Sequence, residues 1–221
     1  MCRSSMVIFG AGGIARETFL MLNTYESLKE KYRVIAFAVD DEYYKEGANV
    51  NNVPLIRAGE DLKRLAQNER KLAVVICIGA ATARKAAFER LRAYGCLSFP
   101  PIISPMVHTA PDLQVGEGSV IHSHCVISVN VKIGKCVFMN CDISLGHDVV
   151  VDDFVSIYPR CDISGNVSIG SCASIGAKSF VLEKKTVGEN AVVAPGAIVL
   201  RNVPPNTTVM GNPAKIYLRN S

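Results

Sequence analysis

Aliphatic side chains recur at every sixth position through the C-terminal half of the chain. The run has no slip, and its members are Val115, Ile121, Ile127, Ile133, Met139, Leu145, Val151, Ile157, Ile163, Ile169, Ile175, Val181, Val187, Val193 and Val199. A second track, four residues further on in each repeat, is small or β-branched except at Lys185. A period of six fits neither a 3.6-residue helix nor a strand that alternates every two residues. The chain must therefore turn every six residues, as an internal repeat.

Short strands that turn at this interval predict a stack of triangular coils. Three strands close one coil, and each coil buries its aliphatic track against the next, so fifteen repeats predict about five coils within residues 104–221. Glycine follows the aliphatic position at several repeats, where we expect it to let the backbone take the corner. These glycines are Gly116, Gly134, Gly146, Gly170, Gly176 and Gly188. Pro204 and Pro205 remove two backbone donors, so we expect coiling to stop there.

Residues 1–103 follow a different pattern, in which apolar strands alternate with amphipathic helices. Strands are predicted over 6–9, 33–39 and 72–78, and a last strand ends at Pro100. Helices are predicted from the turn after Gly10 to about residue 23, over 60–67 and over 81–94. This alternation favours a small Rossmann-like α/β domain, with a parallel sheet and a nucleotide site at the carboxyl ends of its strands.

The first strand-to-helix turn carries a phosphate-binding signature. Gly10 to Ala15 match G-x-G-x-x-A, and Asp40 and Asp41 close the next strand. The free amides of the helix N-terminus would bind a phosphate, and one carboxylate would hold a ribose hydroxyl. About 100 residues supply only half of a dinucleotide-binding unit, so a single nucleotide linked to a sugar fits better. The alternative is that the glycines only serve a tight turn.

Composition excludes several classes of partner. The net charge of the 221 residues is +4, and the basic residues are spread along the chain, which disfavours nucleic acid binding. No apolar run reaches the length of a membrane span and no signal-peptide core opens the chain, so we expect a cytoplasmic protein. Cys125 and Cys161 lie two coils apart, about 10 Å, beyond the reach of a disulfide, and no cysteine spacing suggests a metal site.

Several motifs together resemble one bacterial family. They are GAGGIARE from Gly10, DD at Asp40, CIGAATAR from Cys77, GHD at Gly146 to Asp148 and GNPAK at Gly211 to Lys215. Their order is similar to that of the hexapeptide-repeat sialic acid O-acetyltransferases and nucleotide-amino-sugar N-acetyltransferases, over essentially the whole chain. The resemblance implies a left-handed parallel β-helix, acetyl-CoA as co-substrate and a homotrimer that binds acetyl-CoA in the groove between subunits. It implies N-acetylation of a nucleotide-linked amino sugar for surface glycans or, alternatively, O-acetylation of sialic acid or a related sugar.

The resemblance also implies roles for individual residues. His147 is the expected general base, a role that suits an imidazole, and Asp148 is the acidic neighbour that orients it. As the third residue of its repeat, His147 should point outward at a corner. The expected substrate contacts are Gly10, Gly12, Gly13, Asp40, Asp41, Arg84 and Asn140. The expected acetyl-CoA contacts are Gly165, Ser156, Asn212, Pro213, Ala214 and Lys215, with the Gly165 amide near the thioester oxygen. Ile14 and Ser156 stand where some relatives have histidine.

Two hypotheses from other classes remain open. A β-helical carbonic anhydrase would need three histidines that converge on zinc between subunits, and His122, His124 and His147 lack a plausible arrangement for this, while His108 precedes the array. A non-catalytic β-helix that binds a nucleotide sugar as a sensor or scaffold is the other hypothesis.

Overall fold

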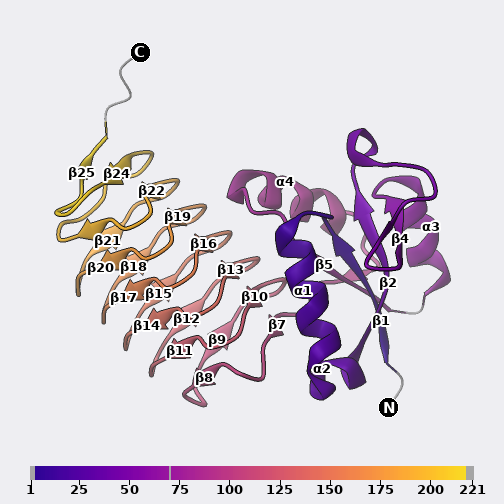
Figure 1. The fold of residues 1–221 in the computed structure, drawn as a ribbon, viewed down its shortest axis with the longest axis horizontal. Coiled ribbons are helices and arrows are strands. Elements are labelled where there is room, and N and C mark those ends of the chain that lie inside the picture. Colours follow the sequence, from indigo (N-terminus) through magenta and orange to yellow (C-terminus); the bar gives the residue numbers. More distant parts are fainter. Residues whose placement is uncertain (1–2, 70, 218–221) are drawn as a thin grey trace. The chain divides into compact units, whose positions relative to one another are not determined.

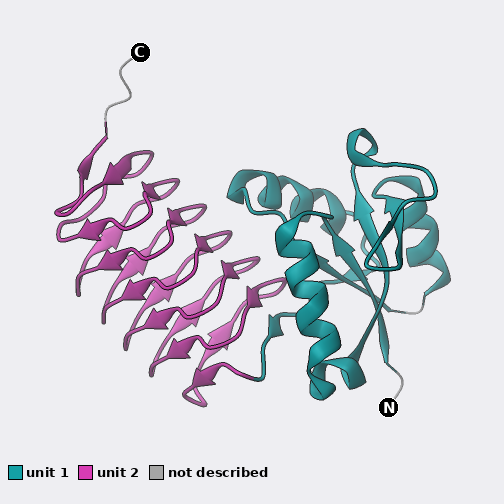
Figure 2. Ribbon diagram, viewed as in Figure 1, with its two compact units in different colours: residues 1–105 teal, residues 106–221 magenta. Residues whose placement is uncertain are grey.

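The computed structural model describes residues 3–69 and 71–217, and the chain divides into two compact units. Residues 1–105 form the first unit and residues 106–221 the second (Figure 2). Within the described residues, no helix is long and apolar enough to cross a bilayer.

The first unit is a parallel sheet with helices on its connections (Figure 1). Its elements are β1 (Ser4–Phe9), α1 (Gly13–Thr24), α2 (Glu26–Lys31), β2 (Tyr32–Val39), the 3-10 helix η1 (Asp41–Tyr43), β3 (Asn49–Val50), β4 (Val53–Arg57), α3 (Glu60–Asn68), β5 (Leu72–Ile76), α4 (Ala81–Arg92), β6 (Leu97–Ser98) and β7 (Ile102–Ile103). The strand order is β3-β4-β2-β1-β5-β6, and only β3 runs antiparallel to its neighbour. The chain therefore reverses its winding direction between β1 and β5.

Strand β4 is not expected from the sequence, because Pro54 interrupts its apolar run. The structure accommodates the proline because β2 pairs with β4 only from Leu55 onward. Pro54 itself lies opposite Asn49 of the short strand β3. A proline at that position removes no donor from the β2–β4 register.

The second unit is a parallel β-helix built from strands of two or three residues. They are β8 (His108–Thr109), β9 (Gln114–Val115), β10 (Val120–Ile121), β11 (Val126–Ile127), β12 (Lys132–Ile133), β13 (Phe138–Met139), β14 (Ser144–Leu145), β15 (Val150–Val151), β16 (Ser156–Ile157), β17 (Asp162–Ile163), β18 (Ser168–Ile169), β19 (Ser174–Ile175), β20 (Phe180–Val181), β21 (Thr186–Val187), β22 (Val192–Val193), β23 (Ile198–Val199), β24 (Thr208–Met210) and β25 (Lys215–Ile216).

The strands of this unit stack in three parallel sheets, one for each side of the coil. One face includes the order β24-β22-β19-β16-β13-β10, the next runs β23-β20-β17-β14-β11-β8, and the third runs β21-β18-β15-β12-β9. Val120 pairs with Phe138, so one coil takes three hexads, as predicted. The first aliphatic track is at most 4% exposed from Ile121 to Val199, so the sixfold period marks the core. Lys185, the one member of the second track that is neither small nor β-branched, is only half-buried.

Both ends of the array differ from the sequence expectation. Strand β8 contains His108 and pairs with β11, so His108 belongs to the array and does not precede it. At the other end, Pro204 and Pro205 do not stop the coil, because β24 follows them and pairs in parallel with β22. Val192 pairs with Ser174 of the preceding coil and with Thr208 of the following one, so the last turn is two residues shorter than the turn before it. The chain ends its coil only at the antiparallel strand β25.

The glycines after the aliphatic positions serve a purpose other than the expected one. Those at 116, 134, 146, 170, 176 and 188 are not left-handed, but a Cβ on any of them would lie 2.4 to 2.7 Å from an atom of the next coil. They are required because neighbouring coils approach closely. The left-handed corner residue comes two positions later, and it is mostly a residue with a side chain, such as Cys136 with φ 48° and Asp148 with φ 60°.

Cys125 and Cys161, on the second track of the β-helix, are buried thiols. Cys125 donates to the carbonyl of Asn140 at 3.1 Å, and Cys161 donates to the carbonyl of Gly176 at 3.0 Å. Burial raises the pKa of each of these two thiols to about 11. No disulfide joins the cysteines that the structure describes.

His122 should make the stability of the protein depend on pH. It is buried at the end of β10, with its ring edge-on to Phe138, and burial lowers its pKa to about 4. The His122 imidazole binds a proton near pH 6.5 in the unfolded chain and only near pH 4 in the folded protein. Stability is therefore complete above pH 6.5 and is lost as the pH falls toward 4, by up to about 3 kcal/mol. Urea unfolding at pH 7.5 and 4.5 should show a smaller difference for His122→Gln than for the exposed-site control His108→Gln. Equal pH dependence in both variants would contradict this assignment.

Candidate functional site

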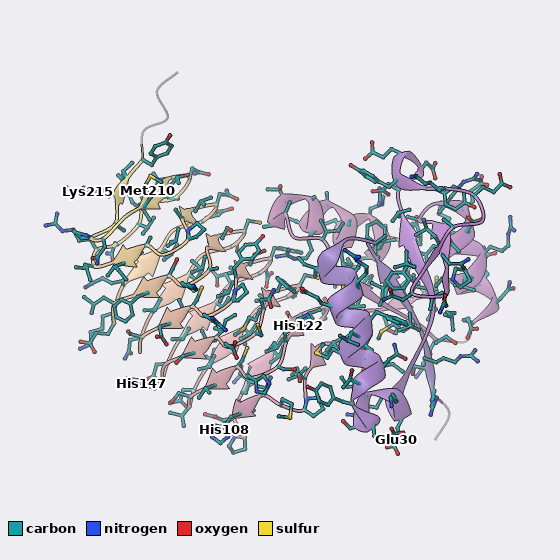
Figure 3. The ribbon with its side chains drawn as sticks, in the orientation of Figure 1. Glu30, His108, His122, His147, Met210 and Lys215 are labelled. Carbon is teal, nitrogen blue, oxygen red and sulfur yellow. The ribbon has the colours of Figure 1, made fainter. Side chains whose placement is uncertain are left out.

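The His147 imidazole lies at an outward corner of the β-helix, in the turn between β14 and β15 (Figure 3). Its side chain is 56% exposed and that of Asp148 is 45% exposed. His147 Nδ1 lies 2.7 Å from Asp148 Oδ2. A carboxylate only accepts hydrogen bonds, so the imidazole carries its proton on Nδ1 and leaves the lone pair on Nε2. This is the geometry of an oriented general base.

Side chains from neighbouring coils complete this corner. Asn130 Nδ2 donates to Asp148 Oδ1 at 3.1 Å, and Asn166 Nδ2 lies 3.4 Å from His147 Nδ1. The hydrogen bonds from His147 and then from Asn130 lower the pKa of Asp148 below its ordinary value, so the carboxylate stays ionised at neutral pH.

Gly165 provides the space for the imidazole. It lies one coil after His147, and a Cβ built on it would lie 2.6 Å from Nε2 and 2.7 Å from Cε1 of His147. The outer edge of the ring therefore faces the Cα of Gly165. Among the described residues, no acceptor is found for the N–H of Gly165. The imidazole and a free backbone donor thus lie next to each other.

A hollow of about 340 Å³ adjoins this corner on the face formed by β9, β12 and β15. Its lining residues are Asp112, Gln114, Asn130, Lys132, Asp148 and Val150. A second hollow of about 400 Å³ continues it along the same strands and shares Lys132 with it. One wall of a groove is therefore in place beside Asp148, and Lys132 supplies a cation within it.

The first unit holds a larger cavity, of about 700 Å³, at the carboxyl ends of β1, β2 and β5. This is the position where the winding direction reverses, which is the usual ligand site of such sheets. The lining includes Gly10, Gly12, Asp40, Tyr43 and Arg90. The structure therefore brings three of the expected substrate contacts, the two glycines and Asp40, to one cavity.

Glycine is suited to positions 10 and 12 of this lining for two different reasons. Gly10 has φ 116°, and a Cβ on it would lie 2.7 Å from the carbonyl oxygen of Cys77, so the fold itself requires glycine there. Gly12 caps α1 without a side-chain hydrogen bond, and a Cβ there would meet nothing within 4 Å. The first amides of α1 and the open space beside Gly12 suit the close approach of an anion.

Three other expected substrate contacts lie elsewhere in this unit. Gly13 begins α1 and Asp41 begins η1, and neither lines the cavity. Arg84 is 1% exposed, and its guanidinium donates to the carbonyls of Ile78 and Gly79 at 2.6 and 3.1 Å. The buried charge of Arg84 therefore holds the loop after β5, and Arg84 is not among the residues that line the cavity.

The remaining expected contacts lie at several places on the β-helix. Asn140 follows β13, and its side-chain oxygen accepts from the N–H of Cys141 at 2.7 Å. Ser156 in β16 is 1% exposed, which leaves it no surface to offer a cofactor, so the structure does not support a direct contact there.

The C-terminal motif lies several coils away from His147. Asn212, Pro213 and Ala214 form the turn before β25, and the N–H of Ala214 donates to the carbonyl of Ile198 in β23. Strand β23 lies three coils after β14, or about 14 Å along the stack. Lys215 lies near this end of the unit (Figure 3). Together with Arg201 it lines a hollow of about 330 Å³.

Four residues of these sites were not identified as site residues in the sequence analysis. Asn130 and Asn166 lie one coil before and after Asp148, so the spacing of three hexads is the signal that points to them. Arg90 follows Ala83, Ala86 and Ala87 on α4 at helical spacing, and all four line the cavity. Arg90 forms an ion pair with Asp40 at 2.6 Å. Tyr43 is exposed on η1, and no sequence pattern around it indicates a role in the cavity.

Among the described residues, no cluster of three His, Cys, Asp or Glu side chains is arranged to hold a metal ion. In the part of the chain that the structure describes, polar side chains gather at the corner of His147 and in the cavity of the first unit.

Comparison with known proteins connects both units to acetyltransferases. Residues 5–91 match the family described as the PglD N-terminal domain. The serine acetyltransferase of Buchnera aphidicola is 36% identical over 126 residues, 57% of this chain and 45% of that protein. The chain thus spans less than half the length of this relative. Nodulation protein L of Rhizobium meliloti is 30% identical over 125 residues, 47% of this chain and 68% of that protein.

Solved structures match the whole fold. PerB from Caulobacter crescentus, in complex with CoA and GDP-perosamine, has a TM-score of 0.86 at 24% identity and covers 98% of both chains. The acetyltransferase domain of PglB from Neisseria gonorrhoeae, in complex with acetyl coenzyme A, has a TM-score of 0.82 at 25% identity, with 98% of this chain and 100% of that one covered. The predicted α/β domain followed by a left-handed β-helix is confirmed. The chain belongs to the hexapeptide-repeat acetyltransferases, in the group whose first domain is of the PglD N-terminal type.

Proposed function

We propose that this protein transfers the acetyl group of acetyl-CoA to the amine of a nucleotide-linked amino sugar. The observation that carries the proposal is the 2.7 Å contact between His147 Nδ1 and Asp148 Oδ2 at an exposed corner. It leaves Nε2 free as a proton acceptor on a side chain that is 56% exposed. The structures of PerB with CoA and GDP-perosamine and of PglB with acetyl coenzyme A support the two substrate classes.

The reaction needs both substrates bound together and no acyl-enzyme. The amine attacks the thioester carbonyl, a C–N bond forms, and the C–S bond breaks. His147 Nε2 accepts the proton that the amine loses and returns it to the departing thiolate. The N–H of Gly165 is proposed to donate to the carbonyl oxygen as negative charge develops on it. Asn140 is proposed to lie near the sugar.

The nucleotide is assigned to the cavity of the first unit. Its volume of about 700 Å³ suits a nucleotide, which the helix N-terminus at Gly12 would bind through phosphate. Tyr43 offers an exposed ring for stacking against a base. Asp40 is proposed to accept a hydrogen bond from a ribose hydroxyl. In the structure its carboxylate also forms an ion pair with Arg90.

Acetyl-CoA is assigned to the outside of the β-helix, from the corner of His147 and Gly165 to the turn of Asn212 to Lys215. The three coils between His147 and this turn, about 14 Å, are a distance that an extended pantetheine arm can cover. The hollows beside Lys132 lie along the coil of His147 and the coils before it, so they are outside this path. We propose that a neighbouring subunit of a homotrimer forms the facing wall of the acetyl-CoA groove. A reaction that consumes acetyl-CoA and a nucleotide sugar takes place in the cytoplasm, as a step in the synthesis of a surface glycan.

Thiol release from acetyl-CoA tests this proposal. The purified protein is incubated with UDP-, GDP-, dTDP- and CMP-linked sugars, each with a free amine or with a hydroxyl in its place. We expect release with at least one nucleotide-linked amino sugar and none with its hydroxyl counterpart. Folded protein that releases no thiol with any amino sugar would contradict the proposal, and release with CMP-linked sialic acid would move the assignment to O-acetylation.

A further inference from the structure

A column of polar residues crosses four successive coils at the corner of His147. We call Asp112, Asn130, Asp148 and Asn166 the corner column, because each member follows the one before it by three hexads, the length of one coil. The last three are left-handed, with φ between 58° and 60°. His147 precedes one member of the column and contacts two of them.

The column holds both oxygens of the Asp148 carboxylate. Oδ2 lies 2.7 Å from His147 Nδ1, and Oδ1 accepts from Asn130 Nδ2 at 3.1 Å. Asn130 is fixed in turn, because its backbone N–H donates to Asp112 Oδ2 at 2.8 Å. A carboxylate that is 45% exposed would otherwise rotate freely in solvent. Here each of its oxygens has a defined donor.

Asparagine combines two properties that suit this position of the column. At φ 58°, most side chains are strained, whereas asparagine adopts left-handed conformations readily. Its amide is also a neutral donor. An aspartate at 130 would place a second carboxylate against Asp148, and a glycine would suit the backbone but leave Oδ1 without this donor.

We propose that Asn130 is a positioning residue for acetyl transfer. By holding Asp148 it keeps the proton of His147 on Nδ1 and the lone pair of Nε2 available to the acceptor amine. The role in catalysis rests on the proposed function, whereas the effect on the imidazole tautomer does not. Asn166 Nδ2 lies 3.4 Å from the same Nδ1, but an amide N–H finds no acceptor on a protonated Nδ1, so Asn166 has no part in this role.

Asn130→Gly tests this role with little backbone strain. We expect kcat to fall about tenfold, as for the loss of one hydrogen bond to a charged group, while the KM values for both substrates stay the same. The ¹⁵N NMR signals of labelled histidine should change from a protonated Nδ1 in the wild type to a mixture of tautomers in the variant. Asn130→Asp, which keeps the size and the left-handed preference, should lower kcat at least as much.

Asn190→Gly is the matched control. Asn190 is also left-handed, with φ 56°, and its amide donates to Asn206 of the next coil at 3.1 Å, at another corner. It should retain wild-type kcat and leave the His147 tautomer unchanged. Equal kcat and equal tautomer in the two glycine variants would overturn the proposal, as would a tenfold loss without any change of tautomer. If the wild type released no thiol, the proposed function would fail, and the tautomer alone would decide the role of Asn130.

Discussion

Replacement of His147 by alanine is expected to lower kcat for acetyl transfer about a thousandfold. A positioned general base contributes typically 10² to 10⁴ in rate, and His147 combines an orienting carboxylate with an exposed side chain. Uncatalysed loss of the proton from the attacking amine would then limit the reaction. The KM for acetyl-CoA should change little, because binding of the thioester does not depend on the base.

Thiol release under saturating substrates measures this effect, with His108→Ala as the matched control. His108 is also an exposed histidine of the β-helix, on β8, but it has no place in the proposed site. Both variants should unfold at nearly the wild-type temperature, since exposed side chains contribute little to stability. A His147→Ala enzyme that retained more than a tenth of the wild-type kcat would rule out the general-base role.

The core of the β-helix could be predicted from the sequence because each buried position depends on one simple period. The first and fifth residues of a hexad face the same interior in every coil, so a Val or Ile at one repeat predicts burial at the next. Even the polar exception at Lys185 corresponds to a break in the burial. The position of His147 followed from the same period, since a third residue between two inward ones must point outward.

The predictions that were wrong concern residues whose role depends on their contacts with the neighbouring coil. A glycine such as Gly146 has the same local sequence context whether it turns a corner or admits the backbone of the following coil, and only the stacked structure shows the second. Pro204 and Pro205 likewise indicated an end to the coil, but the chain takes them into a last turn that is two residues shorter.

The polar contacts of the sites were predictable only in part. The spacing of one coil places Asn130 and Asn166 beside Asp148, but does not show which atoms meet. Arg84 and Arg90 both lie on α4 close to the same cavity. One guanidinium is buried under the loop after β5 and the other pairs with Asp40 in the cavity, and composition alone does not distinguish them.

Gly165→Ala is expected to lower kcat about a hundredfold without unfolding the protein. The new Cβ would lie 2.6 Å from Nε2 of His147, which is closer than two such atoms can approach, so one of them must move. The atom in the way is at the far end of an exposed side chain, and the imidazole can therefore swing outward at little cost to the fold. A displacement of about 1 Å from the reacting atoms is sufficient for a hundredfold loss.

Two other glycine variants separate displacement of the ring from damage to the coil. A Cβ on Gly146 would lie 2.5 Å from the backbone nitrogen of Gly165, which cannot swing away, so Gly146→Ala should lower both the unfolding temperature and the activity. A Cβ on Gly59, before α3, would meet nothing within 4 Å, so Gly59→Ala should change neither. Gly165→Ala should unfold at the same temperature as Gly59→Ala but have a low activity, like Gly146→Ala. If it kept wild-type kcat, the imidazole would not need its place over Gly165, and the site would have to be assigned to another orientation of His147.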